Sequence, residues 1–216
     1  MKSVRGVFSL LVVGAGLAVA GAAASATVLY DNLSAPIDGE DFISAVGATF
    51  SVGPLADSFS TGGSAMSLTD LKVRVSGDPA SNGDVGISLL ADNSASPGAF
   101  IATLGGIAAG SLGSDLVYDF SLASPIALAA NTRYWIELTT TNVSATWPFS
   151  LDLSGTGVAS EFFFSAGAPA PNFEGPYLMR VEATVPEPAT VGLVGLAMLA
   201  LAMLRRKKAW SNVVQD

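Results

Sequence analysis

Short runs of β-branched, aromatic and leucine side chains alternate with clusters of Gly, Pro, Asn, Asp and Ser between residues 27 and 185. Such runs are typical of short strands separated by turns. In residues 66–75, for example, Leu71, Val73 and Val75 share one face and Lys72 and Arg74 share the other, as in a half-buried strand. The predicted strands are 27–30, 48–52, 56–60, 66–75, 85–91, 99–104, 116–122, 126–128, 133–140, 149–153, 161–165 and 176–184.

This pattern predicts an all-β fold. Many short strands with glycine-rich turns, and no apolar helical period longer than two turns, fit a jelly-roll-like antiparallel β-sandwich. Asn82-Gly83 is a dipeptide typical of hairpins, and Pro97-Gly98 marks another turn. We expect one such domain over residues 27–185.

The N-terminal segment has the organisation of a secretory signal peptide. Two cations precede an apolar run at 7–19, and small residues follow up to Ala24-Ser25-Ala26. This A-x-A ending predicts cleavage before Thr27, so that residues 1–26 are removed. The alternative is a membrane helix that is retained.

Charge and composition exclude several classes of function. Residues 27–185 hold four cations (Lys72, Arg74, Arg133 and Arg180) against sixteen acidic residues, a net charge of 4 − 16 = −12. A surface this acidic repels phosphate backbones, so we expect no nucleic-acid partner. The chain has 0 Cys and 0 His, which excludes disulfides, histidine general bases and ordinary zinc sites.

Five segments resemble the bacterial choice-of-anchor family, most closely its R-type domain. They are VLYDNL at 28–33, PLADSFSTG at 54–62, VGISLLADNSASPGAFIATL at 85–104, PIALAANTRYWIEL at 125–138 and PYLMRV at 176–181. The resemblance implies an extracellular β-sandwich displayed through a C-terminal sorting signal. It identifies no catalytic residue.

The C-terminal segment combines three features in order. Pro186, Glu187 and Pro188 form a tripeptide that disfavours helix. Residues 189–204 are uncharged and would form a single transmembrane helix of about 24 Å, slightly shorter than a hydrocarbon core of about 30 Å. A basic stop follows, which by the positive-inside rule leaves residues 209–216 as a cytoplasmic tail; it consists of Arg205, Arg206, Lys207 and Lys208.

This ordered triple over residues 186–208 resembles a PEP-CTERM sorting signal; the alternative is an ordinary tail anchor. The resemblance implies an inner-membrane-anchored precursor with its domain outside, cut near the tripeptide by an exosortase and then moved to the cell surface or the extracellular space. We expect a surface or extracellular-matrix protein with a non-catalytic structural or interaction role in exopolysaccharide or biofilm. Its expected partners are the exosortase, the inner membrane before processing and extracellular polysaccharide.

No residue pattern predicts an enzyme. The acidic neighbours are as expected by chance among sixteen carboxylates, and Ser58 and Ser60 have no base in the sequence pattern. We predict no cofactor, with calcium as an open alternative because Asp78, Asn82 and Asp84 lie within one turn. Ordinary Asx turns explain these three residues equally well.

A carbohydrate-binding module is the alternative function. Exposed aromatic rings stack on sugars, and Trp147 and Phe149 are the candidates because Trp147-Pro148 is expected in a loop. Trp135, in contrast, is expected to pack on a sheet face.

Overall fold

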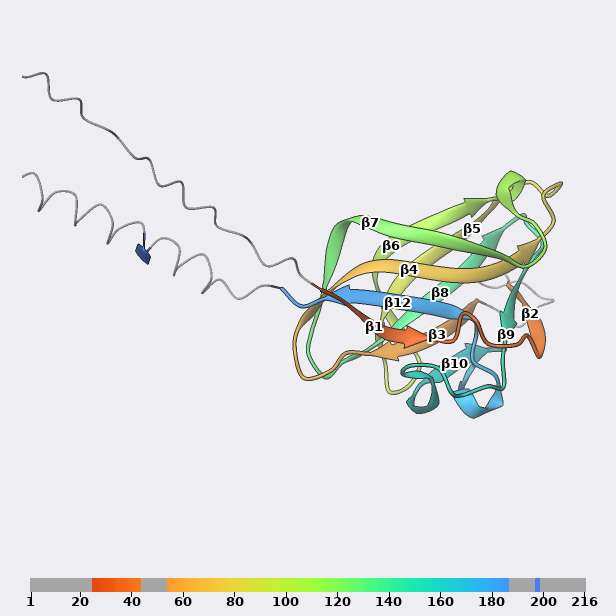
Figure 1. Ribbon diagram of the computed structural model, residues 1–216. Helices are drawn as coiled ribbons and strands as arrows, with labels where there is room; N and C mark the ends of the chain where they lie inside the picture. Colours follow the sequence, from red (N-terminus) through yellow and green to blue (C-terminus); the bar gives the residue numbers. More distant parts are fainter. Residues whose placement is uncertain (1–24, 44–53, 187–196, 199–216) are drawn as a thin grey trace, which may run out of the picture. The chain divides into compact units, whose positions relative to one another are not determined.

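Antiparallel strands dominate the computed structural model, which describes residues 25–43, 54–186 and 197–198 (Figure 1). The strands are β1 (Ala26–Asp31), β2 (Gly39–Ile43), β3 (Leu55–Ser60), β4 (Met66–Gly77), β5 (Asp84–Asp92), β6 (Pro97–Ala108), β7 (Leu116–Leu128), β8 (Arg133–Thr141), β9 (Ala145–Phe149), β10 (Phe162–Ser165), β11 (Ala168–Pro171) and β12 (Met179–Thr184). Three 3₁₀ turns join them: η1 (Ala109–Ser111), η2 (Val158–Ser160) and η3 (Asn172–Glu174). The predicted all-β antiparallel class is confirmed, and the jelly-roll connectivity stays a prediction.

Two sheets make up the sandwich. The first has the order β1-β12-β4-β9-β2, with β7 paired to β4, and the second has the order β11-β10-β3-β8-β5-β6. The last strand, β12, lies between β1 and β4, and Ala26 is opposite Thr184. The two ends of the domain therefore leave the same end of the same sheet (Figure 1).

The core lies between the sheets because strand side chains alternate between two faces. On β4, Leu71, Val73 and Val75 are fully buried, and on β8 Ile136 and Leu138 are fully buried in the same cluster. Each such side chain contributes about 1.5–3 kcal/mol through its burial. Packing across the two sheets thus stabilises a domain that has no disulfide.

A smaller cluster covers the outer side of the second sheet. Ala56, Leu90 and Trp135 are buried there beneath Phe162 and Phe164. The Trp135 indole N–H donates to Asp92 Oδ1 over 2.9 Å. Trp135 packs on a sheet face, as the sequence predicts.

Two predicted strand boundaries are wrong. The strand expected at 149–153 ends at Phe149 instead, because residues 145–149 pair with β2 and β4. The segments 116–122 and 126–128 form the single strand β7, with a register irregularity opposite Leu68–Asp70. The strand expected at 48–52 lies outside the described residues.

Two edge strands were missed by the sequence pattern. The stretch at 39–43, where no strand is predicted, is β2, which pairs with β9. The stretch Ala-Pro-Ala-Pro at 168–171 is β11, at the edge of the second sheet. Acidic residues, alanine and proline are depleted in strands, and proline is tolerated at an edge, so neither stretch has a strand signature.

The terminal segments contribute little to the described structure. Among the residues that it covers, no helix has the length and apolar character needed to cross a bilayer. The predicted signal peptide lies outside the described residues except for Ser25 and Ala26. Of the predicted transmembrane segment at 189–204, only Ala197 and Met198 are described, both helical.

Candidate functional site

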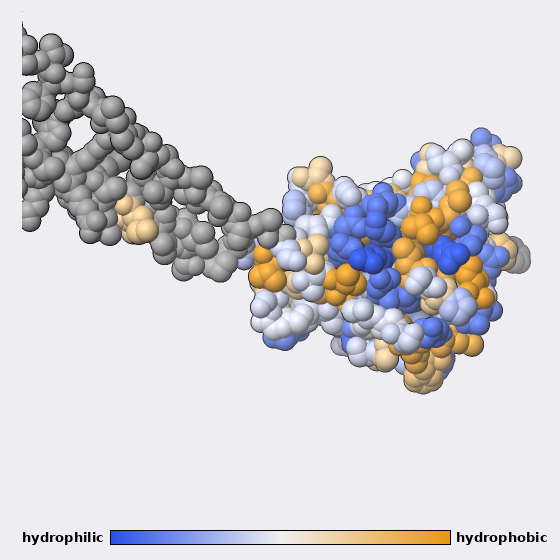
Figure 2. All heavy atoms as spheres, viewed as in Figure 1, coloured by the Kyte–Doolittle hydropathy of each residue, from blue (hydrophilic) through white to orange (hydrophobic). Residues whose placement is uncertain are grey.

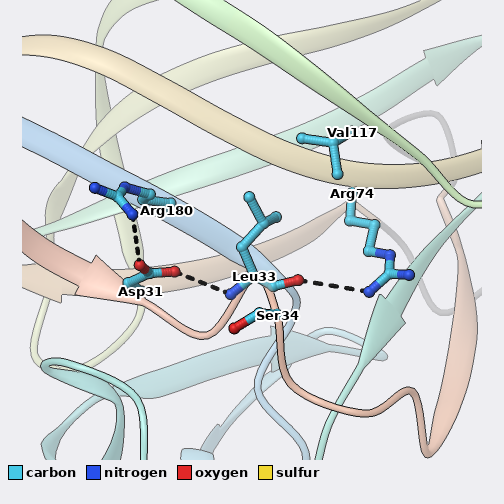
Figure 3. A pocket seen from close by; sticks show the side chains of 6 residues that line it. All are labelled: Asp31, Leu33, Ser34, Arg74, Val117 and Arg180. Carbon is cyan, nitrogen blue, oxygen red and sulfur yellow. Dashed lines mark hydrogen bonds and ion pairs between the residues drawn. The ribbon is translucent and has the colours of Figure 1, made fainter.

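A shallow basin of about 370 Å³ opens on the outer face of the first sheet. Arg74 of β4, Val117 of β7, and Arg180 of β12 form its floor, and the segment after β1 closes one side (Figure 3). That segment supplies Leu33 and Ser34, and the end of β1 supplies Asp31. The basin thus combines two guanidinium groups, a carboxylate and two apolar side chains.

Arg180 is held by carboxylates on two sides. Its Nη1 donates to Asp31 Oδ2 over 2.9 Å and its Nε to Glu182 Oε1 over 2.6 Å. Asp31 also accepts from the Leu33 backbone N–H, at 3.1 Å, which fixes the turn that lines the basin. The hydrogen bond to Glu182 and the charge of Asp31 together raise the pKa of Arg180.

Arg74 forms a two-pronged pair with Asp115. Its Nε and Nη2 donate to the two carboxylate oxygens of Asp115 over 2.5 and 2.6 Å, and its Nη1 donates to the Leu33 carbonyl over 3.5 Å. Asp115 has a left-handed φ of 57°, which aspartate tolerates better than most residues. Its backbone N–H donates to Ser76 Oγ over 2.9 Å, so β4 and the start of β7 fix the guanidinium together.

Beside the basin, charged side chains continue across β12, β4 and β7. Arg180 is opposite Lys72, and Lys72 is opposite Asp119. The hydrogen bond between Lys72 and Asp119 raises the pKa of Lys72 and lowers that of Asp119. Burial, on the other hand, raises the pKa of the neighbouring Asp70. Figure 2 shows this hydrophilic band across the sheet, next to a hydrophobic strip.

The charges of this face nearly balance. Three cations, Lys72, Arg74 and Arg180, stand among five carboxylates, those of Asp31, Asp70, Asp115, Asp119 and Glu182, which leaves 3 − 5 = −2. The face therefore exerts little net attraction on an anionic ligand. A guanidinium has five N–H groups, and Arg180 uses two of them in these pairs. The remaining donors, the carboxylate acceptors and the apolar side chains of Leu33 and Val117 suit a neutral, hydroxyl-rich ligand.

A second polar cluster is sealed inside the sandwich. Asp57 of β3 is fully buried and accepts from the Tyr177 backbone N–H at 2.7 Å and from Tyr30 Oη at 3.4 Å. Asn172 Nδ2 donates to Asp57 Oδ1 at 3.4 Å. Burial raises the pKa of Asp57 well above its ordinary value. These bonds tie the chain before β12 to the opposite sheet.

Ser58, which the sequence offers as a serine without a base, is hydrogen-bonded to the buried Glu161. Ser58 Oγ donates to Glu161 Oε2 over 2.7 Å, and Arg133 Nε donates to the same oxygen over 2.8 Å. Ser58 is fully buried and Glu161 is 3% exposed. A serine enclosed in this way has no surface for a substrate, so the pair acts as a structural link between β3 and the segment before β10.

The predicted exposure of Trp147 is wrong. Trp147 lies in β9, not in a loop, and is fully buried. Its ring stacks on Tyr177 with centroids 4.7 Å apart, and its Nε1 donates to the Leu178 carbonyl over 3.1 Å. Phe149 is partly buried against the same core. Neither ring forms an exposed platform for a sugar, because β9 lies between β4 and β2 and packs both side chains against the core.

The calcium candidates lie in a tight turn. Asp78 Oδ1 accepts from the Ala80 backbone N–H at 2.9 Å, an Asx turn of the kind that the sequence offers as the alternative. Asp78 and Asp84 are exposed, and Asn82 lies between them. Within the described ranges, no three His, Cys, Asp or Glu residues are grouped to hold a metal ion.

The predicted processing residues lie at the domain ends. Ala26 and Thr27 are the first two residues of β1, opposite Thr184 and Ala183. Pro186 is exposed, two residues after β12. Ala24, Glu187, Pro188 and the basic stop at 205–208 lie outside the described residues.

Sequence reasoning missed the basin. One feature of the sequence could have indicated it. Three of the four cations of the domain, Lys72, Arg74 and Arg180, lie at outward positions of predicted strands. Nothing in the sequence says that β12 lies next to β4. Asp31 and Leu33 reach the basin through the pairing of β1 with β12.

Comparison with known proteins identifies the C-terminal segment. Residues 184–207 match the family model described as the PEP-CTERM protein-sorting motif. The match supports an exported protein with a membrane-anchored precursor that an exosortase processes, as the sequence predicts. A comparison with curated proteins finds no match to the chain. The resemblance of residues 28–181 to a choice-of-anchor domain stays a prediction.

Proposed function

We propose that this chain is a surface or extracellular-matrix protein whose sandwich has a non-catalytic structural or interaction role in exopolysaccharide or biofilm. The observation that carries the proposal is the position of the sorting motif relative to the fold. The matched segment begins at Thr184, the last residue of β12. A cut near residues 186–188 therefore removes the anchor and leaves every described strand in the product.

The interior of the sandwich supports a non-catalytic role. Its buried acidic groups, Asp57 and Glu161, are engaged by backbone, Tyr30, Ser58 and Arg133. The bonds of Asp57 connect the two sheets, those of Glu161 connect segments of the second sheet, and both carboxylates are enclosed away from a substrate. A stable display domain needs these links because it has no disulfide.

Intact mass of the protein from cells with and without the processing enzyme tests this proposal. We expect a mature species that starts near Thr27 and ends near residues 186–188, found at the surface or in the extracellular fraction. Cells without the enzyme should retain the membrane-bound precursor. Wild-type cells whose protein still carries residues 205–208 would refute the processing, and a mature species absent from the matrix fraction would refute the structural role.

Carbohydrate binding is the second candidate, and the basin around Arg74 and Arg180 favours it. Paired guanidinium and carboxylate groups offer fixed donors and acceptors to neighbouring hydroxyls, and Leu33 and Val117 offer an apolar surface to the C–H face of a sugar ring. The near-balance of charge on this face favours neutral over acidic glycans. This proposal places the ligand at the basin rather than at Trp147.

A glycan array on residues 27–186, with and without calcium, tests the second candidate. Arg74→Gln and Arg180→Gln should each reduce binding to neutral glycans at least about tenfold, because each removes charged donors from the basin. Lys72→Gln is the matched control, since it makes the same change of charge on the same face outside the basin. Equal binding by all three variants, or no binding to any glycan, would exclude this candidate.

A further inference from the structure

The chain between the last strand and the sorting tripeptide is very short. β12 ends at Thr184, and Glu187 is the third residue after it. Three residues of extended chain span at most about 11 Å. An enzyme that cuts at residues 186–188 must therefore work directly beside the folded domain, unless β12 detaches first.

Detachment of β12 is strongly opposed by the fold. β12 is paired on both sides, with β1 and with β4. Met179, Val181 and Ala183 on its inner face are fully buried. Pulling this strand out would open the core and break two ladders, so the substrate of the enzyme is the folded domain.

Two loops of the domain lie at this end beside β12. Residues 61–65 join β3 to β4, and residues 129–132 join β7 to β8 (Figure 1). The loops are bonded to each other through Thr61 N–H to the Thr132 carbonyl at 3.0 Å and Asn131 N–H to the Gly62 carbonyl at 2.8 Å. Ser67, just after the first loop, is opposite Thr184. The loops thus lie next to the point where β12 ends.

The two loops carry no charge, although Arg133 directly follows the second loop and Asp92 lies at the end of the neighbouring strand β5. The stretches 58–69 and 121–132 contain no Asp, Glu, Lys or Arg, although the domain has a net charge of 4 − 16 = −12. Residues 62–65 are exposed, as are Ala129 and Asn131. The opposite end has Asp78 and Asp84 flanking a single loop. An uncharged surface avoids the cost of burying unpaired charges in a contact.

We infer that this end, formed by residues 61–65 and 129–132 beside Thr184, is the surface on which the enzyme that cuts the sorting motif docks. The inference rests on the proposed processing. The enzyme contacts small, uncharged loop residues while the tripeptide enters its active site. The rigid end of the sandwich then sets how far the tripeptide reaches.

Added charge at this end tests the inference in the full-length protein. Ser64→Asp with Asn131→Asp places two carboxylates on the loops, and aspartate tolerates the left-handed φ of 51° at residue 131. Ala80→Asp with Gly110→Asp is the matched control, because it adds the same charge at exposed positions of the opposite end. Pulse-chase measurement of precursor and mature forms follows the conversion.

We expect the Ser64/Asn131 variant to be converted at least about fivefold more slowly than the wild type and the control to stay within about twofold. A Gly-Ser linker of about eight residues after Val185 adds a reach of about 16 Å and should restore conversion of the slow variant. Unchanged conversion of the Ser64/Asn131 variant, or a slow variant that the linker does not rescue, would overturn the inference. Failure of the proposed processing is distinguishable, because the wild type itself would then show no conversion.

Discussion

Replacing Trp147 with alanine should destabilise the domain severely. The indole is fully buried in β9, stacks on Tyr177 and donates to the Leu178 carbonyl. Truncation to alanine removes the ring from the packing between β9 and the chain that leads into β12. It also removes one of the two donors to the Leu178 carbonyl, which keeps its hydrogen bond from the Arg74 backbone N–H.

The magnitude follows from these contacts. Truncation of a buried tryptophan costs about 3–5 kcal/mol. The stacked pair contributes about 0.5–1.5 kcal/mol and the lost hydrogen bond about 0.5–1.5 kcal/mol, and both overlap with the first figure. We expect a loss of about 4–5 kcal/mol, which is roughly a quarter or more of the stability of a typical domain. Trp147→Phe keeps an aromatic ring and loses the hydrogen bond, so it should cost about 1–2 kcal/mol.

Urea unfolding of residues 27–186, followed by far-UV circular dichroism, measures these losses. Phe100→Ala is the matched control, because that ring is 62% exposed in β6 and its removal should cost less than about 1 kcal/mol. The order of stability should be wild type, Phe100→Ala, Trp147→Phe and Trp147→Ala. A Trp147→Ala domain as stable as the wild type would refute the placement of this residue in the core.

Three further predictions concern the polar interior and the turns. Because burial raises the pKa of Asp57 in the folded state, the folded domain binds this proton more tightly than the unfolded chain, and its contribution to stability falls as pH rises from about 4 through the raised pKa. Asp57→Asn should therefore make the fall of unfolding free energy with pH shallower, as urea titrations at several pH values would show; an unchanged slope would contradict the assignment. Gly157→Ala should lower the unfolding free energy by more than about 2 kcal/mol, because residue 157 has φ of 74° and a Cβ there would meet the Leu29 carbonyl oxygen at 2.3 Å. EDTA should leave the melting temperature of the domain unchanged, since the Asp78 carboxylate is used in an Asx turn; a calcium-dependent rise of several degrees would restore the metal hypothesis.

The strand positions followed from local pattern where the pattern was strong. Leu71, Val73 and Val75 alternate with Lys72 and Arg74, and the structure places the first set in the core and the second on the outer face. The pattern failed at edges, where pairing with a neighbour stabilises a stretch of unfavourable residues, as in β2 and β11. It also failed at Trp147, because exposure depends on what packs against a strand, and a Trp-Pro dipeptide does not reveal that.

The sequence by itself determined the sorting signal of this protein. A linear motif is read by its order and spacing, so Pro186, Glu187 and Pro188, with the uncharged segment and basic stop behind them, are recognisable without a fold. Only the tertiary structure determined the surfaces and the buried groups of the domain before that signal. Insertion of β12 between β1 and β4 builds the basin of Arg74 and Arg180, places Asp57 against the Tyr177 backbone and brings the end of β12 next to the start of β4. These features depend on strands more than a hundred residues apart, and hydrogen-bonded pairing over such distances leaves no local trace in the chain.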